Sequence, residues 1–262
     1  MKLRVMVVGA MCFLMSSFAV ADKVLSQSYT ISDRIRYIEA GDSVTVELRQ
    51  GETASLSAEA TAAELERVTV DVKGERLTLG VEREKGGFWG WFAGNDHDVK
   101  FVVQLPQPAS LTLLGASQAH VGDIETQTFN VDASGASHAH FQKLVVNKLE
   151  LDASGASKIS IEKIQAQELK VSSSGASKVE VSGSSNTDKL DADISGASKY
   201  LGRNLVAKQA KVNASGASRA DIHVADSMAV DVSGASHISY MGSPRIKQDV
   251  SGASGIESVD KW

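Results

Sequence analysis

Apolar and polar residues alternate with a period of two along most of the second half of the chain. In residues 149–161, Leu149 and Leu151 alternate with polar residues before a Ser-Gly-Ala-Ser tetrapeptide, and Ile159 and Ile161 alternate again after it. A period of two is that of a β-strand with one buried face. Each such unit therefore predicts a strand, a Ser-Gly-Ala-Ser corner, a second strand and a short connector.

Eight Gly-Ala-Ser tripeptides divide this half of the chain into units of nearly constant length. Seven follow a Ser and the first follows a Leu; their glycines are Gly115, Gly135, Gly155, Gly175, Gly196, Gly216, Gly234 and Gly252. Successive spacings are 20, 20, 20, 21, 20, 18 and 18 residues, a period typical of stacked repeats. Glycine adopts a positive φ without a Cβ clash, so these glycines are predicted structural corners. We expect the small Ala to point inward there, and the Ser hydroxyls to bond nearby backbone or the next coil.

Strands one period apart would pair in parallel at about 4.8 Å, which closes the hydrogen-bond ladder that a single strand leaves open. The repeats therefore predict an all-β fold, a single-stranded parallel β-helix (β-solenoid) of coils of about 20 residues, which we expect to be right-handed. The residues missing from the last two periods are expected to come from the connector. A row of separate β-hairpins is the alternative, but the connectors mostly lack the turn residues that hairpins need.

The part of the chain before the repeats is also β-rich but contains no Gly-Ala-Ser. Alternating segments cover residues 43–48, 67–72, 77–79 and 99–105. The Lys-Gly-Glu-Arg tetrapeptide at residues 73–76 predicts a hairpin turn between two of them. We interpret residues 22–262 as one domain, in which an irregular opening section (22–110) precedes the repeats (111–262).

The first 21 residues have the pattern of a secretory signal peptide. Lys2 and Arg4 precede an almost wholly apolar run that ends in Ala-Val-Ala, and we expect cleavage after Ala21. An uncleaved membrane anchor is the alternative, but the apolar run is shorter than the roughly 20 residues that a span needs. Cys12, the single cysteine, lies in this segment, so no disulfide is expected. We therefore expect an exported protein of the periplasm, cell envelope or extracellular space.

Charge and motif content narrow the classes of function. The formal net charge is −5 and would be about −7 without the signal peptide, which argues against a nucleic-acid partner. After the signal peptide no stretch is long and apolar enough to predict a membrane span. The sequence contains no catalytic motif, and none of its many serines has an identifiable base and orienting acid, so we expect neither an enzyme nor a cofactor. A polysaccharide-active β-helix enzyme remains the alternative, by analogy of fold alone.

Stacking the repeats would align equivalent residues into columns. Just after the corners, four consecutive coils place a cation: Lys158, Lys178, Lys199 and Arg219. This basic column is a candidate track for an anionic polymer such as an acidic glycan. The plainer interpretation is an outward position that favours long soluble side chains and blocks lateral sheet pairing.

A second column, just before the corners, is rich in carboxylates. It contains Asp132, Asp152, Ser172, Asp193, Asn213, Asp231 and Asp249. Oxygen ligands suit Ca²⁺, but the glycine-aspartate nonapeptide of calcium β-rolls is absent, and Asp before a turn more often bonds the local backbone. We therefore predict no metal site.

An aromatic segment interrupts the opening section. Residues 85–98 are glycine-rich and contain Phe88, Trp89, Trp91 and Phe92 within five positions. Such a segment is a candidate binding site for sugar rings, a membrane interface or a partner. Equally, it could cover an open end of the solenoid, which needs hydrophobic cover.

Three segments carry a further signal: Ile-Glu-Ala-Gly-Asp-Ser-Val-Thr-Val at 38–46, residues 102–117 around Leu-Thr-Leu-Leu-Gly-Ala-Ser, and the segment from Tyr240 to Ser254. Together with the repeats they give the chain a resemblance to the head GIN domain family, which is labelled as auto-transporter adhesins. It implies a β-helical fold and an exported or cell-surface location. We expect a non-catalytic binding or structural role, adhesion or glycan binding among them, with a glycan or another envelope protein as partner. Self-assembly into an envelope scaffold is a further alternative.

Overall fold

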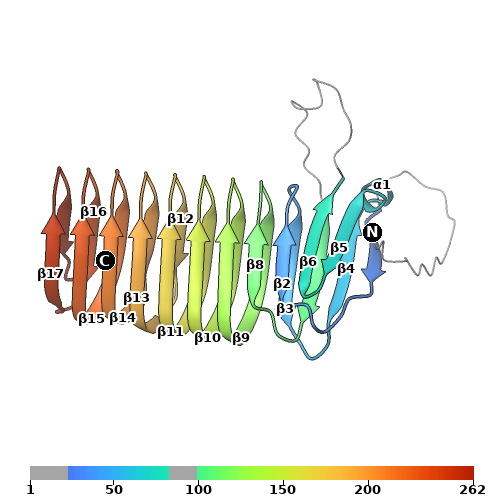
Figure 1. Cartoon of the computed structure of the whole chain (residues 1–262), viewed down its shortest axis with the longest axis horizontal. Helices are drawn as coiled ribbons and strands as arrows, with labels where there is room; N and C mark the ends of the chain where they lie inside the picture. Colours follow the sequence, from blue (N-terminus) through green and yellow to red (C-terminus); the bar gives the residue numbers. More distant parts are fainter. Residues whose placement is uncertain (1–22, 83–98) are drawn as a thin grey trace, which may run out of the picture.

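The computed structural model describes residues 23–82 and 99–262, which wind into one solenoid built from a single sheet (Figure 1). The predicted signal peptide and the whole aromatic segment (residues 85–98) lie outside these residues. The opening section contributes β1 (Leu25–Tyr29), β2 (Tyr37–Ala40), β3 (Thr45–Gln50), β4 (Ser55–Ala60), the helix α1 (Ala62–Leu65), β5 (Val68–Lys73), β6 (Arg76–Val81), β7 (Lys100–Leu105) and β8 (Ser110–Leu113). The repeats contribute β9 (Gln118–Ala133), β10 (His138–Ala153), β11 (Lys158–Ser173), β12 (Lys178–Val181), β13 (Ser185–Ile194), β14 (Lys199–Ala214), β15 (Arg219–Val232), β16 (His237–Met241), β17 (Arg245–Val250) and β18 (Gly255–Ser258).

The predicted solenoid is confirmed by the register of the strands. Strand β10 pairs in parallel with β9 on one side and with β11 on the other, each residue facing the one 20 positions away. The coil of β15 is two residues shorter because its pairing with β14 shifts twice, between Gly202 and Val206 and between Ala207 and Gln209, which is the expected connector.

The predicted connector is itself part of the strand. In β10 the alternation of buried and outward residues is interrupted twice, at residues 142–143 and 147–148, where two successive side chains point outward. The pairing of β10 with β11 also skips residues 142 and 147. Each coil therefore has three straight runs, which we call the first face (138–141 in this coil), the second face (143–146) and the third face (148–153).

The corners confirm the role of glycine and correct that of alanine. The eight corner glycines have φ between 71° and 80°. The Ala beside each is exposed, whereas the following Ser, such as Ser157, is buried at every corner but the last. The Ser157 hydroxyl donates to the carbonyl of Ala133 in the preceding coil at 2.9 Å. The inward position lies beside a carbonyl that needs a donor, and a hydroxyl supplies one where a methyl group cannot.

The interior is filled by aligned apolar side chains, one layer per coil. Phe129 and Phe141 meet edge to face with ring centroids 6.0 Å apart. Tyr200 is completely buried, and a Cβ on Gly202 would lie 2.6 Å from its hydroxyl oxygen. Burial raises the pKa of Tyr200 above its ordinary value, because the phenolate would lose its hydration.

The opening section extends the solenoid by two coils. Strands β2 and β3 stack beside β8 and β9, and strands β6 and β7 stack beside β2 and β3. Between β2 and β3, Asp42 occupies the corner position with φ 59°. Strand β6 ends at Val81 and β7 begins at Lys100, and residues 83–98 between them lie outside the described residues.

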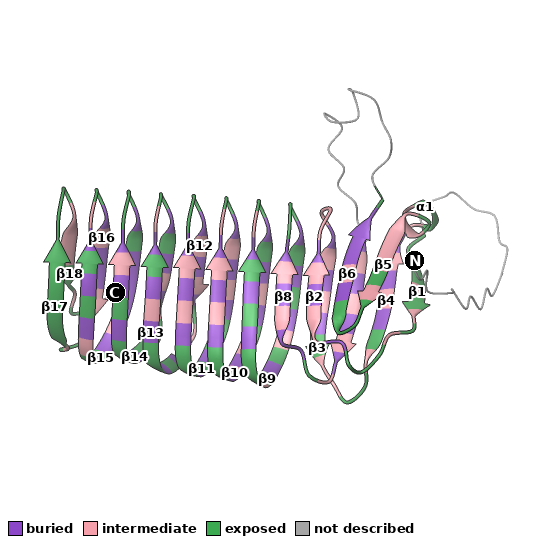
Figure 2. Cartoon of the chain, in the orientation of Figure 1, coloured by how far each residue is buried: buried purple, intermediate pink, exposed green. Residues whose placement is uncertain are grey.

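The two ends of the solenoid differ. At the N-terminal end, β4 and β5 run antiparallel to β7 and β6, and β1 pairs with β4. Helix α1 joins β4 to β5 and begins with a capping box between Thr61 and Glu64. At the C-terminal end, β17 is an edge strand that is exposed along its whole length (Figure 2). In the part of the chain that the structure describes, no helix is long and apolar enough to cross a membrane.

Candidate binding grooves on the flank

The predicted basic column exists on the first face. Lys158, Lys178, Lys199 and Arg219 occupy directly paired positions on neighbouring coils. The column continues at His237, which pairs with Arg219. Sequence periodicity therefore located these four side chains correctly relative to one another.

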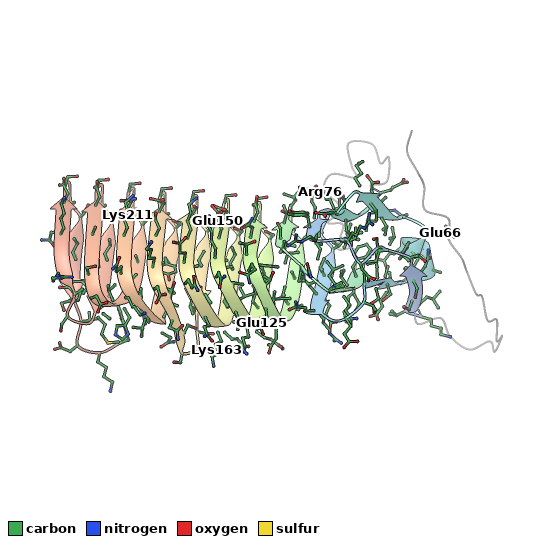
Figure 3. The ribbon with its side chains drawn as sticks, turned by 60° about the horizontal axis from the view of Figure 1, so that its bottom comes forward. Glu66, Arg76, Glu125, Glu150, Lys163 and Lys211 are labelled. Atoms are coloured by element: carbon green, nitrogen blue, oxygen red, sulfur yellow. The ribbon has the colours of Figure 1, made fainter. Side chains whose placement is uncertain are left out.

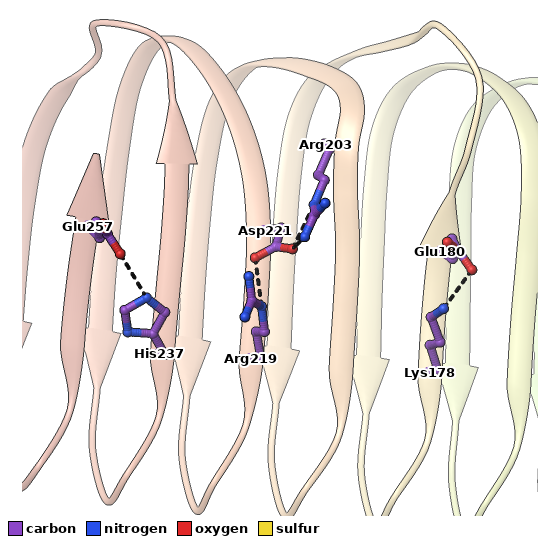
Figure 4. A network of polar contacts seen from close by, with 7 residues as sticks. All are labelled: Lys178, Glu180, Arg203, Arg219, Asp221, His237 and Glu257. Carbon is purple, nitrogen blue, oxygen red and sulfur yellow. Dashed lines mark hydrogen bonds and ion pairs between the residues drawn. The ribbon is translucent and has the colours of Figure 1, made fainter. Parts of the chain in front are cut away.

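Acids two residues further along the same strands neutralise much of this column (Figure 4). Glu180 lies 2.8 Å from the ammonium of Lys178 and 4.0 Å from that of Lys158. The hydrogen bond from Lys178 holds the pKa of Glu180 below its ordinary value. Arg219 donates to Asp221 at 3.0 Å. Much of the column's charge is thus already paired within the protein.

Asp221 is the centre of a network that the sequence did not predict. Its side chain is fully buried, although it occupies an outward position of the first face. Arg203 donates to it from Nε at 2.8 Å and from Nη2 at 2.6 Å. The same guanidinium lies 4.9 Å from the ring centroid of Trp262. Residues 259–262, the C-terminal strap, therefore return over earlier coils, and the chain end lies beside β14 and β15 (Figure 1).

A groove of about 670 Å³ runs along the third face; we call it the lysine groove. It lies between two columns of outward side chains that run along the solenoid axis. Glu150 and Lys211 belong to the same one of these columns (Figure 3). Its charged lining residues are Lys148, Glu168, Lys170, Lys189, Asp191, Lys211, Arg245 and Lys247. This groove was not predicted from the sequence, although a period of 20 residues applied to the third face would have revealed its charged columns.

The N-terminal half of the lysine groove is balanced in charge. Cations and acids alternate both along the strands and between coils. Lys170 lies 2.7 Å from Glu150, and Lys189 lies 3.4 Å from Glu168. The hydrogen bond from Lys170 holds the pKa of Glu150 below its ordinary value. This half is a cross-strand ion-pair lattice, which stabilises neighbouring coils modestly.

The predicted carboxylate column borders a second groove of about 500 Å³, the acidic groove. Asp152, Asp193 and Asp231 line it together with corner serines. Burial, with a smaller contribution from Asp152, raises the pKa of Asp132 in the same column. Among residues 23–82 and 99–262, no three His, Cys, Asp or Glu side chains converge as a metal site requires.

A third groove, of about 740 Å³, lies where the second face meets the third. Side-chain amides dominate its lining, and Asn147 donates to Gln127 one coil away. At one end, Gln50 exchanges two hydrogen bonds with the backbone of Glu125, at 2.8 and 3.0 Å, as a paired strand would. This amide groove is uncharged along most of its length.

The aromatic candidates Phe88, Trp89, Trp91 and Phe92 lie outside the described residues. The structure places only the flanks of their segment. On the C-terminal flank, the carbonyl of Val99 accepts a hydrogen bond from the amide of Thr45 at 3.0 Å. The flanking strands β6 and β7 lie near the N-terminal end, and the role of the aromatic segment in binding stays a prediction.

A known protein family matches most of the chain. The sequence matches the family described as "Putative auto-transporter adhesin, head GIN domain" over residues 36–244. None of the curated proteins compared matches the chain.

Solved structures of several bacterial proteins share the fold. A "putative adhesin" from Parabacteroides merdae superposes with a TM-score of 0.80 at 19% identity, covering 92% of this chain and 98% of that chain. A "putative lipid binding protein" from Parabacteroides distasonis gives a TM-score of 0.71 at 20% identity, with the same coverage. A "putative adhesin" from Bacteroides fragilis gives 0.66 at 18% identity, covering 91% and 98%.

At these identities the structural likeness establishes the fold alone, and the sequence match establishes the family. The family match covers the opening coils and all but the last of the Gly-Ala-Ser corners. The chain belongs to the head GIN domain family.

Proposed function

We propose that this chain is an exported, non-catalytic binding module of the cell envelope, with an adhesin-type role, which holds an extended ligand along the flank of its solenoid. The observation that carries the proposal is the shape of the flank. Three grooves run beside columns of outward side chains, and each spans several coils. An extended ligand can contact equivalent residues on successive coils, as in other solenoids with long binding surfaces.

The distribution of acids supports binding over catalysis. The carboxylates of the acidic groove stand on alternate coils of one axial column, about 10 Å apart, because Ser172 and Asn213 occupy the coils between them. Glycoside hydrolysis needs two carboxyl groups facing each other across a scissile bond, one of them as a general acid. The names of the structural relatives, adhesins and a lipid-binding protein, also point to binding.

Self-association is a second candidate function, and the open C-terminal edge favours it. Among residues 23–82 and 99–262, strand β17 pairs with β15 alone, and Ile246 and Val250 are 37% and 42% exposed. Exposed strand edges pair readily with other chains. Sedimentation at increasing protein concentration would show growth in mass if these edges associate, and a constant monomer mass would exclude this role.

A glycan array probed with the purified chain tests the primary proposal, with a Trp89→Ala/Trp91→Ala variant beside it. Binding to any glycan supports the binding role, and its loss in the variant would locate the contact in the aromatic segment. Binding that survives in the variant would direct attention to the grooves. If neither glycans nor envelope proteins bind, a structural role replaces the proposal.

A further inference from the structure

The lysine groove loses its acids toward the C-terminal end. From Lys211 onward its charged lining residues are Lys211, Arg245 and Lys247, and within the described residues none of the three makes an ion pair. The outward column that contains Lys211 continues on the N-terminal side at Asp191, which pairs in register with Lys211. This end of the groove therefore concentrates positive charge on a chain whose net charge is negative.

Small side chains leave a hollow between these cations. On the coil between Lys211 and Lys247, the outward positions of the groove hold Ser227 and Ala229. Ala229 is exposed, and Met228 between them points inward and is buried. Two coil spacings separate the strands of Lys211 and Lys247, about 10 Å. An anionic group in the hollow could therefore reach cations on both sides.

We propose that the C-terminal half of the lysine groove binds the acidic groups of a linear anionic polysaccharide lying along the solenoid axis. This inference rests on the proposed function and names its site and ligand class. Lys211 and Lys247 supply compact charges to successive acidic groups. Arg245 supplies a planar fork that matches a carboxylate or sulfate with two parallel hydrogen bonds.

The neighbouring acids favour a narrow polymer over a flat anionic membrane. Asp231 and Asp249 follow Ala229 and Lys247 by two positions and belong to the adjacent acidic column, about 7 Å away. A bilayer surface pressed against the third face would meet this column together with the cations. A single chain can occupy the groove and avoid the acids. The charges on the third face therefore favour a narrow ligand that lies along the groove.

One exposed position tests the proposal with little disturbance of the fold. Ala229→Glu places a carboxylate in the hollow between Lys211 and Lys247, whereas Ala229→Gln adds the same bulk without charge. We expect Ala229→Glu to keep its thermal stability, because the new acid can pair with the two lysines. Its affinity for polygalacturonate should fall at least tenfold, the equivalent of one lost charge-assisted hydrogen bond, and Ala229→Gln should lose much less.

Two triple variants that remove the same charge distinguish binding in the lysine groove from a general attraction of acidic polymers to exposed cations. Lys211→Gln/Arg245→Gln/Lys247→Gln should abolish measurable binding to polygalacturonate and dextran sulfate. Lys158→Gln/Lys178→Gln/Lys199→Gln, on the first face, removes the same charge and should retain most of the affinity. Neutral dextran should not bind, and added salt should weaken binding to both acidic polymers because it screens exposed charges.

Each outcome decides the proposal. Equal losses in the two triple variants, or in Ala229→Glu and Ala229→Gln, would overturn it. Binding to phosphatidylglycerol vesicles without binding to the acidic polysaccharides would also overturn it, in favour of a membrane ligand. If the chain binds only neutral glycans or a protein, this inference fails while the proposed binding function stands.

Discussion

Every corner glycine except the first, Gly115, meets two requirements, a left-handed backbone and a close approach to the preceding coil. Gly175 has φ 75°, and a Cβ there would lie 2.6 Å from the carbonyl oxygen of Gly155. The amide of Ala176 donates to that same oxygen at 2.7 Å. A side chain at the glycine would thus disturb the hydrogen bond that joins neighbouring corners.

Substitution of two glycines separates these requirements. Gly74, in the hairpin turn, also has a positive φ of 61°, but a Cβ there would have no other atom within 4 Å. We expect Gly74→Ala to lower the free energy of unfolding by about 1 kcal/mol, the cost of a left-handed conformation. Gly175→Ala should cost more, by about 1–3 kcal/mol for overpacking in addition. Urea unfolding of both variants measures the difference, and equal costs would show that close packing is unimportant.

Two acids on the third face should respond to pH in opposite directions. The pKa of Asp132 is raised in the folded protein, so ionisation destabilises the fold as pH rises through the interval above its ordinary value. The pKa of Glu150 is lowered, so its stabilisation is present at neutral pH and lost as pH falls through the folded value.

We therefore expect Asp132→Asn to raise the free energy of unfolding at pH 7 and to have little effect near pH 3. Glu150→Gln should lower that free energy at pH 7, by about 0.5 kcal/mol for a surface pair, and the difference should likewise vanish in acid. Urea titrations at the two pH values measure both. A change of the same sign at pH 7 in both variants would contradict the assigned causes.

At the scale of elements, the C-terminal strap is joined to the solenoid through one guanidinium. Arg203 contacts Asp221 and the ring of Trp262, so it links the strap to two coils. Breaking a buried ion pair costs about 3–5 kcal/mol, and the half-exposed arginines reduce that value here.

We expect Asp221→Ala to lower the free energy of unfolding by about 2 kcal/mol, because it leaves both arginines without their carboxylate. Trp262→Ala should cost about 1 kcal/mol, the value of an exposed cation–π contact, and should release the strap alone. Hydrogen exchange would then increase at Val259 without change in the interior coils. Increased exchange throughout β15 in Trp262→Ala would show that the strap stabilises the solenoid itself.

The sequence predicted what depends on periodicity and missed what depends on pairing between unlike segments. Alternation and glycine spacing located the corners, the coil register and the basic column, because each repeat carries the same signal. The antiparallel pairing of β4 with β7 has no such signal, and the four-residue helix was detectable only from Thr61 and Glu64. The inward position of Ser157 was not predicted, because the prediction considered only the small size of Ala and not the carbonyl to which the Ser157 hydroxyl donates.

Candidate site residues were predicted less completely than the fold. The repeat period alone predicts that cations align in a column. It does not predict whether acids in the next column neutralise them, as Glu180 does for Lys178 on the first face. The Arg203 network depends on a chain end that folds back over several coils. Contacts of that kind follow from three-dimensional packing and leave no periodic trace in the sequence.

On the scale of the whole molecule, the repeats should be removable one coil at a time. Ser154 and Ser174 occupy equivalent corner positions, so deletion of residues 155–174 joins Ser154 to Gly175 in register. We expect a shorter solenoid that still unfolds cooperatively, with a smaller urea m-value because less surface is buried. Deletion of residues 155–164 is the control, since it removes half a coil and should prevent folding. Loss of cooperative unfolding in both deletions would contradict a repeat-by-repeat architecture.

The hydrogen bonds between neighbouring corners have a mechanical consequence. They run along the solenoid axis, so a load that pulls the two ends apart opens one coil after another, as a zipper opens. The uncapped C-terminal edge would yield before the N-terminal end, which antiparallel strands cover. Each released coil would lengthen the tether by about 60–70 Å, for roughly 20 residues at about 3.4 Å each. If one end were fixed and a ligand were bound along the flank, the protein would extend in equal steps under a sudden load before the ligand dissociates.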